Sequence, residues 1–215
     1  MKNIRRVNIG CGANPTPGYD NFDNSFSVWL ANHPFLSVLL SRGISKQQRE
    51  FIRSAKKNQI RWADATKKIP FPDRCVAVVY SSHTLEHLDP DEANLFLAEA
   101  RRILVSGGKV RIVVPDFAQQ IAQYNSDKDA DEFLRYTNLT RPKPKNLGEK
   151  VKLLMVGMRH HLWAYDANSM SRLLSAVGFQ DVCILQPGET TISDPGELNL
   201  YERAEWSLFA EATNP

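Results

Sequence analysis

The sequence lacks the features that mark secreted, membrane-spanning or disordered proteins. Its 215 residues include only three cysteines, Cys11, Cys75 and Cys183, at wide spacing, which suits reduced thiols better than a disulfide framework. The longest mainly apolar stretch, Val28 to Leu40, is interrupted by polar residues and is shorter than the roughly 20 residues that a membrane span needs. The N-terminus lacks the apolar run and cleavage site of a signal peptide, so we expect no membrane span and a cytoplasmic protein.

The composition also lacks a strong excess of charge of one sign. Lys and Arg total 27 against 24 Asp and Glu, which gives a formal net charge of +3. With 42% hydrophobic and 24% charged residues, the chain is ordinary globular material, so a disordered or collagen-like protein is excluded. The length fits one domain of generous size, and we predict a single domain over residues 1–215.

The charges are unevenly distributed along the chain. Residues 42–61 contain seven basic residues and one acid, a local charge of +6. Residues 141–152 contain five basic residues and one acid, a local charge of +4. The rest of the chain therefore carries a charge of −7, so two basic segments interrupt an acidic body.

Short apolar runs alternate with segments of helical periodicity, a pattern typical of a parallel α/β sheet with helices on both faces. The expected strands are residues 6–9, 19–23, 60–63, 76–80, 109–114, 182–185 and 206–211. The expected helices lie within residues 26–57 and at about residues 90–104, 117–124, 131–136 and 167–177. The clearest helix start has Asp89 as its cap, Pro90 at its first position and Glu92 completing a capping box. We see no internal repeat and predict one domain with two insertions.

Polar residues and glycines follow several of the predicted strands. Gly10-Cys11-Gly12 ends the first strand, Asp23 the second, Asp64 the third and Ser81-Ser82-His83 the fourth. Because the carboxyl ends of parallel strands meet at one edge, these groups lie where an open α/β sheet places its ligand crevice. The glycine turn alone is a weak signal, since a purely structural turn would have the same sequence.

Four strings of the sequence carry a family resemblance. They are V-N-I-G-C-G (7–12), A-D-A-T-K-K-I-P-F-P-D (63–73), V-V-Y-S-S-H-T-L-E-H-L (78–88) and R-R-I-L-V-S-G-G-K-V-R-I-V-V-P-D (101–116). Together they closely resemble the class I S-adenosylmethionine-dependent methyltransferases, and most of all the small-molecule group whose members read L-P-F-x-D and L-E-H-L at these places. The resemblance spans about residues 7–182.

This resemblance implies a Rossmann-like, mostly parallel seven-stranded sheet with an antiparallel last hairpin, and S-adenosyl-L-methionine as the cofactor. It implies that the glycine turn packs beneath the methionine part of the cofactor, that Asp23 accepts from both ribose hydroxyls, and that Asp64 accepts from the adenine amino group. The complete set of cofactor-binding residues that we expect is Asn8, Gly10, Cys11, Gly12, Asp23, Asp64, Ala65 and Ser81. We assign no metal ligands.

The sequence departs from the family pattern around this turn. Asn8 stands where an acidic residue is usual, and Asn14 stands where a third glycine is usual. Asp23 follows Gly10 by 13 positions, where a nucleotide-binding unit usually has about 20. We therefore expect the first crossover helix to be very short or absent.

For a hydroxyl acceptor, the enzyme must align the oxygen and remove its proton, and histidine is the natural base near neutral pH. Of the five histidines, His83 is best placed, directly after the fourth strand. His87 is expected to order the loop before Asp89. We expect at most one of His160 and His161 to line the acceptor pocket, and we take His83 and His161 as the candidate catalytic residues.

Three alternatives remain open. The string His83-x-x-Glu86-His87 has the spacing of inverted zinc peptidases, which need these residues on one helix face, whereas here the string follows a strand and precedes a new helix start. A nicotinamide-dependent oxidoreductase is disfavoured by the missing glycine and the short spacing to Asp23. A non-catalytic member could keep the fold and bind a partner through its basic segments.

The insertions, at about residues 24–59 and 125–160, are expected to form a lid on the acceptor side. Five cations share one side of a helix whose other side is apolar: Lys46, Arg49, Arg53, Lys56 and Lys57. This pattern fits either a solvated helix face or the steering of an acidic acceptor, such as a phosphorylated sugar or glycan precursor. Nucleic acid is a less suitable partner, because the sequence shows no RNA-binding module or basic-aromatic stacking motif.

Overall fold

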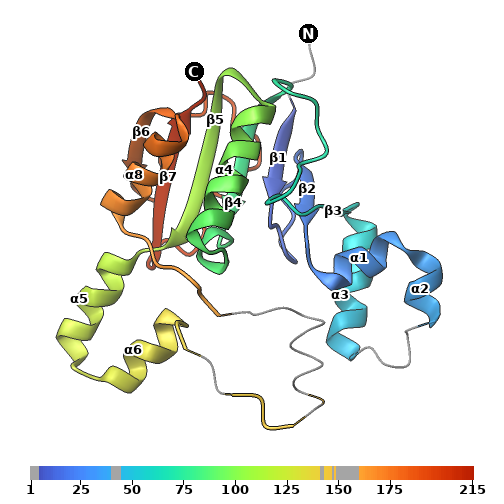
Figure 1. Cartoon of the computed structure of the whole chain (residues 1–215), viewed down its shortest axis with the longest axis horizontal. Helices are drawn as coiled ribbons and strands as arrows, with labels where there is room; N and C mark the ends of the chain where they lie inside the picture. Colours follow the sequence, from blue (N-terminus) through green and yellow to red (C-terminus); the bar gives the residue numbers. More distant parts are fainter. Residues whose placement is uncertain (1–4, 40–44, 141–142, 147, 149–159) are drawn as a thin grey trace.

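A seven-stranded sheet in the order β3-β2-β1-β4-β5-β7-β6 forms the centre of this computed structural model, which describes residues 5–39, 45–140, 143–146, 148 and 160–215 (Figure 1). The strands are β1 (Arg6–Ile9), β2 (Asp20–Asp23), β3 (Arg61–Trp62), β4 (Val76–Ser82), β5 (Leu104–Pro115), β6 (Gln180–Leu185) and β7 (Ser207–Thr213). β1 to β5 pair in parallel, and β7 runs antiparallel to both β5 and β6. The predicted Rossmann-like sheet with an antiparallel last hairpin is confirmed.

Helices flank this sheet. They are α1 (Phe26–Asn32), α2 (Pro34–Leu39), α3 (Lys46–Lys57), α4 (Pro90–Ile103), α5 (Phe117–Asp127), α6 (Ala130–Thr137) and α8 (Ala167–Val177), with a short 3-10 helix, η2 (Leu85–His87). At the start of α4, Asp89 accepts from the Glu92 N–H and the Glu92 side chain accepts from the Asp89 N–H, which is the predicted capping box. No helix in the described part of the chain is long and apolar enough to cross a membrane.

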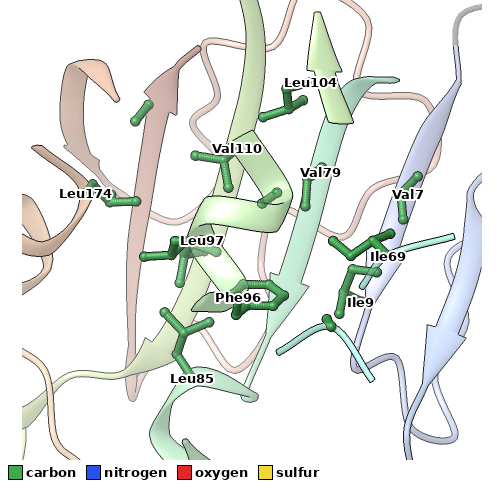
Figure 2. Close-up of a cluster of buried hydrophobic side chains, with 14 of the residues drawn as sticks. Val7, Ile9, Ile69, Val79, Leu85, Phe96, Leu97, Leu104, Val110 and Leu174 are labelled. Atoms are coloured by element: carbon green, nitrogen blue, oxygen red, sulfur yellow. The ribbon is translucent and has the colours of Figure 1, made fainter. Parts of the chain in front are cut away.

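The main core lies between one face of the sheet and helices α4 and α8. Figure 2 shows Phe96 and Leu97 of α4 beside side chains that rise from β4 and β5, such as Val79 and Val110. Phe96 and Leu97 are at most 1% exposed, so each burial contributes about 1.5–3 kcal/mol. This apolar layer fixes β4, and with it the residues that follow β4, against the rest of the sheet.

The first crossover helix is absent, as the short spacing to Asp23 predicts. The ten residues between β1 and β2, all described, form turns instead. The sheet face opposite α4 is covered by residues 186–206, which contribute Ile192 and Leu198 to a second apolar cluster. The Tyr19 hydroxyl donates to the Pro195 carbonyl at 2.8 Å, and Arg6 pairs with Asp194.

β5 begins at Leu104, five residues before the predicted start at Lys109. Leu104 pairs with Val76, and the β4–β5 register then shifts. Asn214 holds this irregular stretch, because its side-chain amide donates to the carbonyls of Leu104 and Val105 and its own carbonyl accepts from the Gly107 N–H. Local periodicity does not reveal hydrogen bonds from a residue as distant in the sequence as Asn214, so the early start of β5 was not predicted.

The two expected insertions extend from the edge of the sheet at which β2 and β5 end (Figure 1). Helices α1 and α3 belong to the first insertion, and their apolar sides pack together through Val28, Leu30, Ile52 and Ala55. The end of α5 and α6 belong to the second. Residues 40–44, 141–142, 147 and 149–159 lie outside the described residues, and with them Arg42, Arg141, Lys150 and Lys152 of the basic segments.

Candidate functional site

The glycine turn after β1 is held against β2 by its main chain. The N–H groups of Gly10 and Cys11 both donate to the Phe22 carbonyl, at 2.8 and 3.1 Å. Gly10 has φ 74°, and a Cβ there would lie 2.1 Å from the Thr84 hydroxyl oxygen. Gly12 has φ 53°, and a Cβ there would meet no atom within 4 Å. Packing therefore requires the first glycine, whereas the second faces open space at the carboxyl end of β1.

Asp23, the last residue of β2, lies beside this turn. One carboxylate oxygen accepts from the Gly12 N–H at 3.0 Å, and the other accepts from the Ser25 N–H at 2.8 Å. An ionised carboxylate offers about four acceptor positions, so about two remain for a ligand. Two ribose hydroxyls would need two acceptors, which is the number that Asp23 retains.

Asp64, just beyond β3, is an ionised carboxylate with one acceptor position to spare. Its Oδ1 accepts from the main-chain N–H and the hydroxyl of Thr66, at 3.2 and 2.7 Å, and its Oδ2 lies 3.0 Å from the Lys67 ammonium. Partial burial raises the pKa of Asp64, but hydrogen bonds from Thr66 and Lys67 outweigh it and hold that pKa below its ordinary value. A single amino group is a suitable donor for the remaining position.

The other four expected cofactor residues have buried side chains. Asn8 is 2% exposed, and its amide donates to the Thr16 hydroxyl at 3.0 Å, so it fixes the turns between β1 and β2. Cys11 packs among the side chains of α1 and α3, where burial and the nearby Asp23 charge raise the pKa of its thiol to about 12. Ala65 belongs to the main core, and the hydroxyl of Ser81 is buried without a partner among the described residues.

His83, directly after β4, has both ring nitrogens close to polar partners. Its Nδ1 lies 3.2 Å from Oε1 of Glu86, and its Nε2 lies 3.2 Å from the Ser207 hydroxyl. The Nδ1 contact with Glu86 lacks the geometry of a hydrogen bond, whereas the Nε2 contact with Ser207 is a hydrogen bond.

Around Glu86 the structure brings together residues that the sequence analysis did not combine. Glu86 is 2% exposed, and ligand atoms of Glu86, His87 and His161 all lie within 4.8 Å of one another. The His87 and His161 rings meet edge to face at 5.1 Å between centroids. The only sequence signal for this meeting was the H-x-x-E-H string, because nothing local pairs residue 87 with residue 161.

The segment after residue 160 docks directly onto η2. The N–H groups of Leu162 and Trp163 donate to the Glu86 carbonyl at 2.7 and 3.2 Å, and His87 bonds through Nδ1 to the His160 carbonyl at 3.1 Å. Burial lowers the pKa of His161, against the opposing effect of the Glu86 carboxylate, so its imidazole is neutral at pH 7. Of the two adjacent histidines, His161 thus contributes its ring and His160 its carbonyl.

The zinc-peptidase interpretation is not favoured by the local backbone. Only residues 85–87 are helical, as a single 3-10 turn, and His83 has φ 50° before that turn begins. His83 and His87 therefore do not share the face of one α-helix, which that mechanism requires.

A groove of about 580 Å³ lies elsewhere, at the start of β2 and the end of α3. Its lining includes Asp20, Lys56 and Arg61. This is the amino end of β2, whereas the glycine turn, Asp64 and the histidines lie at or beyond the carboxyl ends of their strands. We therefore place the candidate site at the carboxyl edge and not in the groove.

Comparisons with known proteins identify a matching domain family and similar structures. Residues 23–112 match the family model of a methyltransferase domain. A S-adenosylmethionine-dependent methyltransferase structure from Methanosarcina mazei has a TM-score of 0.54 at 14% identity, covering 100% of this chain and 93% of the other. One from Thermotoga maritima, described as a possible histamine N-methyltransferase, has a TM-score of 0.50 at 17% identity, covering 98% and 82%. No curated protein matches the sequence significantly.

Proposed function

We propose that this chain is a class I S-adenosylmethionine-dependent methyltransferase that methylates a hydroxyl group of a small or glycan-type acceptor, because residues 23–112 match a methyltransferase domain and the strand order is that of a Rossmann-like sheet. The observation that carries the proposal is the convergence of two sets of residues at one sheet edge. Gly12, Asp23 and Asp64 offer open space and spare acceptors after β1, β2 and β3. The buried carboxylate of Glu86 follows β4 together with His83 and His87, and His161 joins them from the segment before α8.

S-adenosyl-L-methionine is the cofactor, and it supplies a methyl group already activated by the positive sulfur. The chain's part is to bind it and to align the acceptor. We assign the ribose hydroxyls to the two spare positions of Asp23 and the adenine amino group to the spare position of Asp64. We also assign the buried residues Asn8, Cys11, Ala65 and Ser81 to this half of the site.

His83 is our candidate for the group that removes the acceptor proton. Its Nδ1 lies 3.2 Å from the Glu86 carboxylate, and its Nε2 lies 3.2 Å from the Ser207 hydroxyl, so an acceptor hydroxyl that takes the place of Ser207 would meet a ring nitrogen able to accept its proton. The buried carboxylate stabilises the imidazolium that results. His161, on the other side of Glu86, lines the acceptor pocket.

The exposed cations of α3 support an acidic acceptor. Lys46, Arg49, Arg53, Lys56 and Lys57 are all exposed, while Ile52 and Ala55 face α1. None of these five cations forms an ion pair within the described part of the chain. A positive field that is not neutralised locally attracts anionic groups, such as the phosphate of a sugar phosphate or nucleotide sugar. We propose that the insertions at residues 24–59 and 125–160 form the acceptor-side lid.

The test uses S-adenosylhomocysteine release on a panel of sugar phosphates, nucleotide sugars, phenols and amines. His83→Gln should lower turnover at least a hundredfold while cofactor affinity, measured by calorimetry, stays unchanged. Ser207→Ala is the matched control, because it leaves the His83 lone pair without a competitor and should keep turnover. Full turnover in His83→Gln would refute the base, and wild-type cofactor binding without turnover on any acceptor would favour a non-catalytic protein.

A further inference from the structure

The environment of Glu86 is unusual for a buried carboxylate. It is 2% exposed, and neither of its oxygens has a hydrogen bond of good geometry among the described residues. Nδ1 of the His83 ring lies 3.2 Å from Oε1, without the geometry of a hydrogen bond. A buried carboxylate normally accepts several hydrogen bonds or coordinates a metal, so this one lacks partners on the side that faces His87 and His161.

We infer that Glu86, His87 and His161 form a binding site for one divalent first-row transition ion, such as Zn²⁺, Mn²⁺ or Co²⁺. Their ligand atoms lie within 4.8 Å of one another. Around an ion with bonds of about 2.0–2.2 Å, ligand atoms stand about 3.4 Å apart, so small side-chain rotations complete the site. Two imidazoles and one carboxylate are a donor set that binds such ions and leaves coordination positions open.

The tautomer of His87 is already set for coordination. Its Nδ1 lies 3.1 Å from the His160 carbonyl oxygen, which can only accept, so Nδ1 carries the proton. The lone pair of the neutral ring is therefore on Nε2. A ligating histidine whose other nitrogen donates to a main-chain carbonyl is the usual arrangement at protein metal sites.

His83 completes the surroundings as a partner of Glu86 and not as a ligand. Its Nδ1 lies 3.2 Å from Oε1 without forming a hydrogen bond, so both carboxylate oxygens are available to the ion. Coordination to a divalent ion would give this buried carboxylate the partners that it lacks among the described residues. This set of ligands differs from the peptidase string, because His161 replaces His83.

A role for the ion in catalysis rests on the proposed function. The acceptor oxygen takes an open position on the ion, which lowers the pKa of its hydroxyl, and the proton passes to Nε2 of His83. The oxygen–carbon bond then forms as the carbon–sulfur bond of the cofactor breaks, and the bonding pair stays on sulfur.

Cobalt titration of the full chain tests ion binding without the cofactor or any acceptor. Protein stripped with a chelator should show a visible absorption band that saturates at one Co²⁺ per chain. His87→Ala, His161→Ala and the isosteric Glu86→Gln should each weaken binding at least tenfold. Thermal unfolding without the ion shows whether each variant is folded.

His160→Ala is the matched control, since only its main-chain carbonyl serves the site. It should bind Co²⁺ like wild type, and so should His33→Ala, at an exposed histidine on the end of α1. Cys75→Ser removes a partly exposed thiol and should also have no effect. Absence of a saturable band in wild type, or equal loss in His160→Ala and His161→Ala, would overturn the inference.

Separate titrations with the cofactor and with Co²⁺ distinguish the metal site from the proposed methyltransferase function. Stripped wild type and His161→Ala should bind S-adenosyl-L-methionine with the same affinity, because the cofactor residues lie after β1, β2 and β3. Cofactor binding without Co²⁺ binding refutes only the metal site. Co²⁺ binding without cofactor binding refutes only the methyltransferase assignment of these residues.

Discussion

Gly10 and Gly12 share one turn but meet different constraints. Both have positive φ, at 74° and 53°, yet only Gly10 is approached closely, by the Thr84 side chain. Thr84 lies between His83 and η2, so the contact ties the turn after β1 to the histidine-bearing segment after β4. One glycine therefore serves the packing of the site, and the other keeps its open side free.

Substitution by alanine should separate these two roles. Gly10→Ala should lower the free energy of unfolding by about 2–4 kcal/mol, since it adds a clash to a strained backbone. Gly12→Ala should cost about 1 kcal/mol for the strain alone, but it should weaken cofactor binding at least tenfold. Urea unfolding and cofactor calorimetry on both variants check the contrast, and equal stability losses would contradict it.

A second residue-scale feature is the ion pair between Arg111 and Glu211, in which both side chains are 0% exposed. Their charged atoms lie 2.5 Å apart, and the hydroxyls of Thr190 and Thr191 donate to the Glu211 oxygens at 2.7 and 2.6 Å. Burial raises the pKa of Glu211, but the hydrogen bonds from Thr191 and Thr190 outweigh it and hold that pKa below its ordinary value. The pair fastens β5 and β7 to the segment that covers the second face.

Glu211→Gln should lower the free energy of unfolding at pH 7 by about 3–5 kcal/mol, because Arg111 is left buried without its partner. A depressed folded pKa stabilises the protein above the ordinary carboxyl pKa of about 4.3, and this stabilisation is lost as pH falls through the folded value. Unfolding free energy should therefore fall less steeply from pH 6 to 3 in Glu211→Gln than in wild type. The exposed Glu132→Gln should follow wild type, and parallel curves for Glu211→Gln would refute the assignment.

At the scale of elements, helix α3 divides into an apolar side that packs on α1 and a cationic side that is exposed. This division follows from residue spacing alone, since Phe51, Ile52 and Ala55 alternate with the five cations at helical intervals. The packing of the apolar side is what the sequence predicted. For the cationic side, we propose the attraction of an anionic acceptor, which the following experiment tests.

Arg49→Ala combined with Arg53→Ala should raise the KM for the best anionic acceptor several-fold at low salt. The difference from wild type should shrink as salt screens the field, while cofactor affinity stays unchanged. Arg172→Ala, at an exposed arginine on α8, is the control and should have little effect. A KM and a salt dependence identical to wild type in the double variant would eliminate acceptor steering.

The elements were predictable wherever their signals are local. The capping box at Asp89 and the glycine stop at Gly178 mark helix ends within a few residues of sequence, and both lie where expected. The early start of β5 was not predictable, because it depends on a hydrogen bond to Leu104 from Asn214, which is distant in the sequence. The meeting of Glu86 with His161 was missed for the same reason, since 75 positions separate them.

At the scale of the whole molecule, the short connection between β1 and β2 affects the opposite end of the chain. A parallel connection usually includes a helix that covers one face of the sheet. Here that face is covered by residues 186–206, through Tyr19, Ile192 and Leu198. The short spacing between Gly10 and Asp23 predicted that this helix is absent. Residues 186–206 have no helical or strand periodicity, so the sequence contained no indication that they cover this face instead.

The structure also shows where the charged segments of the sequence lie in the fold. The cations of the first basic segment that the structure describes lie mostly on α3, in the first insertion (Figure 1), and Lys56 and Lys57 at its end line the groove at the start of β2. The acidic residues that we assign to the cofactor, Asp23 and Asp64, belong to the body. A net charge of +3 thus combines an acidic body, which includes the residues that we assign to the cofactor, with basic segments in the insertions that we propose as the acceptor-side lid.

Calorimetric titration with S-adenosyl-L-methionine tests whether this chain binds the cofactor through the residues that follow β1, β2 and β3. Wild type should bind one equivalent, and Asp64→Ala should bind at least tenfold more weakly, since it loses an acceptor that is charged. Asp73→Ala, at an exposed carboxylate that pairs with Arg102, is the matched control and should bind like wild type. An absence of binding by wild type, or equal affinities of wild type and a folded Asp64→Ala, would contradict the account.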